Sequence, residues 1–197
     1  MQIDAKSVHS GVAAHIRGVW PGRTVVRTRM NSIDYQEDAP QIANEPIEVL
    51  EIAPEKPDGA WVYASWGAWQ TPTQGQPLSE FLLVSLDSSM RHVETVYDVI
   101  TLHADGGGPI RLYETLNLGR PWQPGSACEH LLVAPPYIID EGLGEFEISG
   151  VAISLSWLIP ITASEVEFAY HHGGFQLGEE IAQAEVNVFE AGRPAVR

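Results

Sequence analysis

The feature that most constrains the fold is a long alternating segment, residues 151–161, near the C-terminal end of the sequence. Its odd-numbered positions are Val, Ile, Leu, Trp, Ile and Ile, whereas most of its even-numbered positions are small. This alternation predicts a strand with one face on a hydrophobic core and a second face that another layer can approach. Thr162-Ala-Ser-Glu165 follows at once as a capping box, which predicts a helix through about His171. A long strand that runs into a helix indicates an α/β or α+β protein.

Weaker patterns predict the other elements. Apolar residues at helical spacing predict a helix over 8–19, and a second helix follows Ser88, which can cap it, and ends at glycines 106–108. Further strands are predicted over residues 24–30, 47–52, 61–66, 81–86 and 131–134, and a last helix over 177–184. Alternating strands and helices favour a layered domain. No repeat or linker divides the chain, so we expect a single domain over residues 1–197.

Charge narrows the classes of partner. The chain has 26 acidic and 11 basic residues, for a formal net charge of −15 at pH 7. Such a balance argues against nucleic acid and anionic membrane surfaces, and it indicates either a basic protein partner or simply solubility. The acids gather in two blocks, residues 34–58 and 140–190, after a net basic first thirty residues. The candidate partner-binding residues, taken from these blocks, are Asp34, Glu37, Asp38, Glu141, Glu145 and Glu147.

The single cysteine, Cys128, excludes an intrachain disulfide and is compatible with a reducing compartment. The N-terminal residues lack the apolar core of a signal peptide, and the apolar segment 151–161 is too short to span a bilayer. We therefore expect a cytoplasmic protein.

Several residues resemble parts of catalytic or metal sites, but none has the required pattern. Cys128 and His130 lie close in sequence, yet residues two apart on a strand share a face without converging on a substrate. His171 and His172 are adjacent, whereas helical zinc sites need wider spacings. We expect no enzyme, cofactor or metal. A hydrolase that uses Cys128 or Ser126 with His130 is the least favoured alternative.

From about Ser79 onward, the order of segments resembles the Suppressor of fused (SUFU) domain family. The resembling segments are Glu80-Phe-Leu-Leu-Val84, Leu118-Gly119 to Pro121-Trp122, Pro124-Gly125-Ser126, His130 to Tyr137, Trp157 to Thr162 with Ser164 to Phe168, and Phe189 to Val196. The first seventy residues match loosely. The resemblance implies a mixed β-sheet flanked by helices. It also implies a structural role for the motif residues Trp122, Gly125, His130, Trp157 and Pro160.

The resemblance further implies a non-enzymatic protein-binding module. Bacterial members often stand alone, and many are regarded as immunity proteins that neutralise a cognate toxin, commonly a nuclease. Such toxins carry basic surfaces, and an acidic inhibitor would associate with them quickly. The alternative is an adaptor that captures an extended peptide by strand addition at an exposed sheet edge. The oligomeric state is left open.

Overall fold

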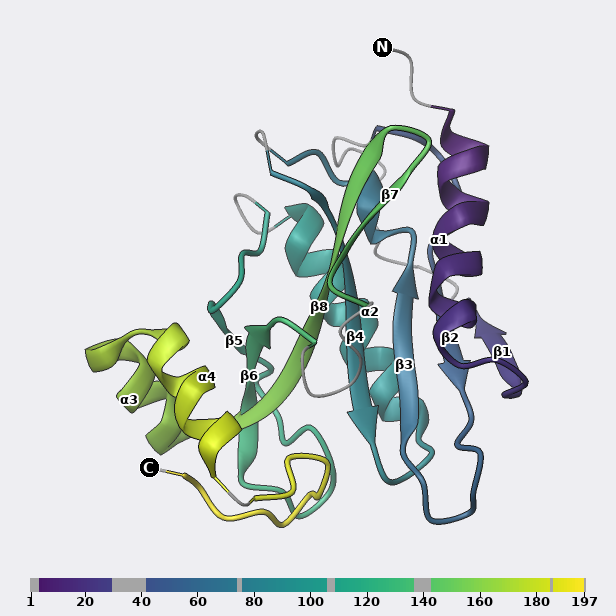
Figure 1. Cartoon of the computed structure of the whole chain (residues 1–197). Coiled ribbons are helices and arrows are strands. Elements are labelled where there is room, and N and C mark those ends of the chain that lie inside the picture. The colour runs from purple at the N-terminus through teal and green to yellow at the C-terminus, as the bar shows by residue number, and fades with distance from the viewer. Residues whose placement is uncertain are drawn as a thin grey trace.

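The chain forms an open, twisted sheet with helices on both faces (Figure 1). The structure, a computed structural model, describes residues 4–29, 42–73, 76–105, 109–136, 143–184 and 186–196. In chain order its elements are α1 (Ala5–Val19), β1 (Val25–Thr28), β2 (Glu48–Ile52), β3 (Trp61–Trp66), the short 3₁₀ helix η1 (Ala68–Gln70), β4 (Leu78–Ser85), α2 (Met90–Asp105), β5 (Thr115–Asn117), β6 (Cys128–Ala134), β7 (Glu145–Ile148), β8 (Val151–Thr162), α3 (Ala163–His172) and α4 (Gly174–Gln183).

The described strands form one mixed sheet in the order β1-β2-β3-β4-β8-β6-β5. The β4 and β8 strands are parallel, and the other neighbours are antiparallel. The β7 strand pairs with the first residues of β8 as a hairpin, on the side where β6 pairs with its last residues. The long strand predicted from alternation is therefore central, and the implied mixed sheet flanked by helices is confirmed.

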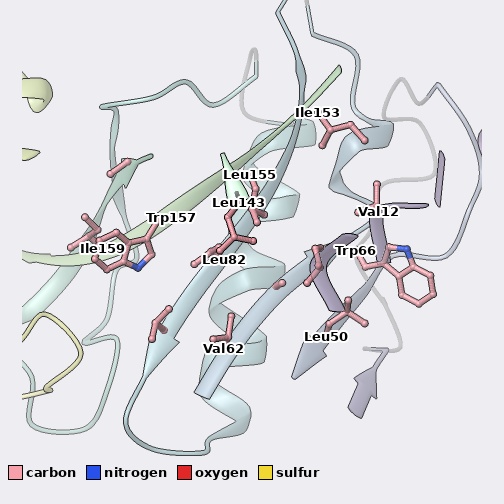
Figure 2. Packing of buried hydrophobic residues seen from close by; sticks show 14 of the residues in the cluster. Val12, Leu50, Val62, Trp66, Leu82, Leu143, Ile153, Leu155, Trp157 and Ile159 are labelled. Atoms are coloured by element: carbon pink, nitrogen blue, oxygen red, sulfur yellow. The ribbon is translucent and has the colours of Figure 1, made fainter. Parts of the chain in front are cut away.

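The two faces of β8 enter two separate cores. The odd-numbered residues, from Val151 to Ile161, pack in a cluster with α1, α4 and one buried residue of α3. Figure 2 shows Val12 of α1 close to Trp66 and Leu50 in this cluster, and Trp157 of β8 further along it. On the opposite face, Leu158 belongs to a second cluster that α2 covers. The predicted small second face thus admits another layer, as expected.

The predicted helix after β8 is confirmed together with its cap. The Thr162 hydroxyl accepts from the Glu165 N–H, and the Glu165 carboxylate accepts from the Thr162 N–H at 2.7 Å. The predicted cap of α2 is wrong by one residue, because Ser89 accepts from the Arg91 N–H at 3.2 Å. The last helix begins at Gly174, earlier than predicted, since α4 follows α3 after the single residue Gly173.

Candidate binding surface

A cleft of about 690 Å³ opens on the α2 side of the sheet, near the first residues of β4 and β8. Its floor is formed by Ser79 of β4 with Ser154 and Ser156 of β8. One wall comes from the segment before β4, and another comes from residues 109–112, between α2 and β5. Small side chains on two neighbouring strands therefore leave space that the helix does not fill.

A polar row crosses three adjacent strands on this floor. Ser79 pairs with Ser154 in the parallel β4–β8 ladder, and Glu145 of β7 pairs with Ser154 from the other side. Paired residues project from the same face of a sheet, and neighbouring strands lie about 4.8 Å apart, so the row is about 10 Å long. It places two hydroxyls beside a carboxylate.

The β7 strand separates charge from core by simple alternation. Glu145 and Glu147 are exposed on the cleft side, whereas Phe146 and Ile148 are half-buried against the α1 side. The close contact with α1 depends on Gly11, since a β-carbon there would lie 2.5 Å from Ile148 Cγ2. The hairpin therefore presents its acidic face to solvent because its apolar face is held by α1.

The wall formed by residues 109–112 is anchored by a buried histidine. The Ile110 N–H donates to His103 Nδ1 at 3.0 Å. Burial lowers the pKa of His103 to about 4, so the neutral ring can accept this bond. The next residue, Arg111, is exposed at the cleft, and its N–H donates to the Glu114 carboxylate at 3.1 Å. These two bonds hold the backbone of Ile110 and Arg111 at the cleft, with the exposed Arg111 side chain among its lining residues.

The predicted contact residues fall partly on this surface. Glu145 lines the cleft, and Glu147 lies beside it on the same face of β7. Asp34, Glu37, Asp38 and Glu141 lie outside the described residues. Four other residues that line the cleft were not predicted from the sequence, namely Ser79, Arg111, Ser154 and Ser156. They come from separate segments, and only their positions in the alternation of the strands could have indicated that they lie together.

A buried ion pair joins the C-terminal segment to β8 and α3. Arg193 Nη1 and Nη2 each donate to one oxygen of Glu165 at 2.7 Å, and both side chains are almost fully buried. Burial alone would raise the pKa of Glu165, but the Arg193 guanidinium and the N–H groups of Thr162 and Val196 lower it overall. The capping carboxylate therefore also fixes the end of the chain.

The same arginine also binds the backbone of Pro160, which pairs with Leu131 of β6. Pro160 lies beyond Leu158, the last residue of β8 that pairs with β4, so its missing N–H removes no bond from that ladder. Its carbonyl accepts from Arg193 Nη2 at 2.7 Å. This hydrogen bond joins Pro160 and Arg193, which both lie in segments that resemble the family.

Glu80 is a fully buried carboxyl group that holds the loop after β3. It accepts from the Ser65 hydroxyl, from the Gly67 N–H at 2.8 Å and from the Trp69 N–H at 3.4 Å. Burial raises its pKa to about 7, because these hydrogen bonds offset only part of the lost hydration.

The residues of the hydrolase alternative have structural contacts instead of an accessible arrangement. Cys128 is buried, and burial raises the pKa of its thiol. The Ser126 hydroxyl accepts from Trp122 Nε1 at 3.0 Å and from the Cys128 N–H at 3.1 Å. The expectation that Cys128 and His130 share a face is wrong, because a register shift between them moves Cys128 to the α2 side with Leu131.

The remaining motif residues differ in burial. Trp122 and Trp157 are fully buried, on opposite sides of the sheet. Gly125 has φ +80°, a left-handed conformation that glycine adopts without strain. His130 is half-buried in β6, where its Nδ1 has no hydrogen-bond partner among the described residues.

Residues 4–196, apart from the undescribed gaps, contain no group of three or more side chains placed to hold a metal ion. His171 and His172 are exposed in the last turn of α3. No helix in the described part of the chain is long and apolar enough to cross a membrane.

The mixed sheet, its two cores and the bound C-terminal segment together define an α/β fold. Comparison with known protein families shows which family has this fold. The model of the Suppressor of fused protein (SUFU) family matches residues 43–194. The chain belongs to this family. The match begins well before Ser79, so the family pattern extends further toward the N-terminus than the sequence motifs indicate. No curated protein matches the chain.

Solved structures share the fold. A SUFU homolog from Neisseria gonorrhoeae FA 1090 superposes with a TM-score of 0.81 at 24% identity, covering 96% of each chain. The Sufu–Fu complex gives 0.67 at 12% identity, covering 89% of this chain and 84% of the other. Drosophila Suppressor of Fused also gives 0.67 at 12% identity, covering 91% of this chain but 46% of the fly chain. This chain therefore spans about half the length of the Drosophila protein.

Proposed function

We propose that this protein is a non-enzymatic binding module that neutralises a basic protein, such as a nuclease toxin, by covering its active surface. The observation that carries the proposal is the exposed acidic face of β7, where Glu145 and Glu147 lie beside an open cleft. A related structure is the Sufu–Fu complex, which makes protein binding a reasonable function for this fold.

The overall charge supports a basic partner. A protein with a formal charge of −15 attracts a cationic partner over a distance and speeds their encounter, and salt screens this attraction. The proposed interface comprises Glu145 and Glu147 and, as a sequence-based proposal, Asp34, Glu37, Asp38 and Glu141. The proposal also includes that the chain is a single domain and that it lies in the cytoplasm, where an endogenous toxin would have to be blocked.

Co-expression and association kinetics test this function. Co-expression with a toxic product of an adjacent gene should restore growth, and stopped-flow mixing of the two proteins should show fast, salt-dependent association. Glu147→Lys should slow association by about tenfold and weaken its salt dependence. The matched control is Glu179→Lys on α4, an exposed residue away from β7. Equal effects of the two substitutions would remove β7 from the interface.

A second candidate function is peptide capture by strand addition, which the open strand edges favour. Among the described strands, β1 and β5 end the sheet and pair on one side only. Val26 of β1 is half-exposed, although an apolar residue on an edge strand is a liability. Strand addition depends on main-chain hydrogen bonds. Partner binding that changes little with salt would therefore favour this function over the charge-driven one.

A further inference from the structure

The cleft on the α2 side of the sheet has the size and the polar lining of a ligand site. Its volume of about 690 Å³ lies within the range of about 300–1,000 Å³ that is usual for binding pockets. Within the described residues, the floor hydroxyls of Ser79, Ser154 and Ser156 make no side-chain hydrogen bond. A serine hydroxyl can donate and accept, so this row can serve both the N–H and the C=O groups of a peptide.

Residues of opposite charge line the cleft on two different segments of the chain. Glu145 ends the polar row on the β7 side, and Arg111 lies on the wall that His103 anchors. Neither residue takes part in an ion pair with another described residue. These two residues therefore favour an occupant that carries both a cation and an anion, and the apolar side chain of Leu112 adds contact surface to the lining.

We propose that this cleft receives a short extended segment of the partner protein, with a basic side chain against Glu145 and an acidic side chain against Arg111. The main chain of the segment lies over the serine hydroxyls. A cleft that is open to solvent admits a segment that continues into a larger molecule. The inference rests on the proposed function, and it adds which kind of partner segment the binding surface recognises.

Short peptides provide the direct test. The probes are acetylated and amidated Gly/Ser peptides that carry one Lys and one Glu, in either order and at varied spacing. Titration into ¹⁵N-labelled protein should shift the amide signals of Ser79, Ser154 and Ser156 in a saturable way. Peptides with two Lys or with two Glu should bind more weakly. The absence of saturable shifts for every mixed-charge peptide would overturn the proposal.

Two sets of variants make the test specific. Ser154→Tyr fills the cleft and should weaken binding of the best peptide by about tenfold or more, which corresponds to the loss of a central contact. The matched control is Ala152→Tyr, on the same face of β8 but outside the cleft. The exchange Glu145→Arg with Arg111→Glu changes only exposed residues and should reverse the preferred order of charges in the peptide. Equal losses in the two tyrosine variants, or an unreversed preference, would refute the assignment.

Binding of the intact partner separates this inference from the proposed function. If Glu147→Lys slows association while Ser154→Tyr leaves the affinity unchanged, the binding function stands and the cleft is not its recognition site. If both variants weaken binding and the control Glu179→Lys does not, the cleft is part of the interface. If no protein partner binds the chain, the proposed function fails, and saturable peptide binding alone then decides whether the cleft is a peptide site.

Discussion

Arg193→Met removes the guanidinium that neutralises the buried Glu165 carboxylate while leaving a flexible apolar side chain of comparable reach. The variant loses two 2.7 Å hydrogen bonds to Glu165, one of 2.7 Å to the Pro160 carbonyl and one of 2.9 Å to the Pro194 carbonyl. Removing one partner of a buried ion pair costs about 3–5 kcal/mol, because the remaining charge is left uncompensated. A domain has about 5–15 kcal/mol of stability in total, so the expected loss is a large fraction of it.

Urea unfolding at neutral pH, followed by tryptophan fluorescence, measures this loss. The matched control is Asp98→Ala, which breaks the 2.9 Å pair with Arg120 and leaves the Arg120–Thr95 hydrogen bond in place; the side chains of Arg120 and Asp98 are 24% and 59% exposed. Exposed pairs contribute about 0–1 kcal/mol, so the control should change little. A loss below about 1 kcal/mol for Arg193→Met, or equal losses in both variants, would refute the reasoning.

The pH dependence gives an independent check on the same pair. The pKa of Glu165 is lowered in the folded protein, so its stabilising contribution is present above its ordinary pKa and is lost as the pH falls through the folded-state pKa. The stability difference between wild type and Arg193→Met should therefore shrink on acidification. A difference that stays constant down to strongly acidic pH would contradict the assignment.

Three further substitutions or reactions test other parts of the structure. Because burial raises the pKa of Glu80 from 4.5 to about 7, wild-type stability should fall by about 3 kcal/mol as the pH rises through this interval. Glu80→Gln should remove that slope from urea-unfolding profiles, and an unchanged slope would contradict the account. The Cys128 thiol should react with an aromatic disulfide reagent only as fast as the protein opens, since it is buried and its pKa is raised; rapid reaction of the native protein would contradict this. Gly125→Ala should cost about 1–2 kcal/mol in thermal unfolding because of its positive φ, and an unchanged midpoint would show that the loop relaxes.

The strand alternation could be read from the sequence because the period of two decides which side chains share a face. Val151 to Ile161 enters the α1-side core on one face and the α2-side core on the other, as predicted. The capping box at Thr162 was equally clear, since its residue types and spacing have one geometric solution. Local patterns of this kind do not depend on the rest of the chain.

Long-range contacts could not be read in the same way. Glu165 already had a role in the capping box, and no local pattern indicates that Arg193, 28 residues later, supplies its counter-charge. Burial of Glu80 was also hidden, because a glutamate at the start of a strand is usually exposed. Both carboxyl groups lie in segments that resemble the family, so the structure gives those motifs a physical reason.

The prediction that Cys128 and His130 share a face was wrong because the strand changes phase between them. The cleft was not predicted because several separate segments form it. The register shift between Cys128 and His130 places them on different faces, although two residues apart on a regular strand share one. The cleft combines residues from β4, β7, β8 and two loops. The parallel pairing of β4 with β8 brings Ser79 beside Ser154, and that pairing was not deducible from either segment.

Hydrogen–deuterium exchange of the chain, alone and with the product of an adjacent gene, tests the central claim most directly. The account predicts a stable complex in which protection increases in β7, in residues 154–156 of β8 and in residues 109–112. Protection confined to α3 and α4, or the absence of any complex, would contradict the claim that the acidic hairpin and its cleft form the binding surface.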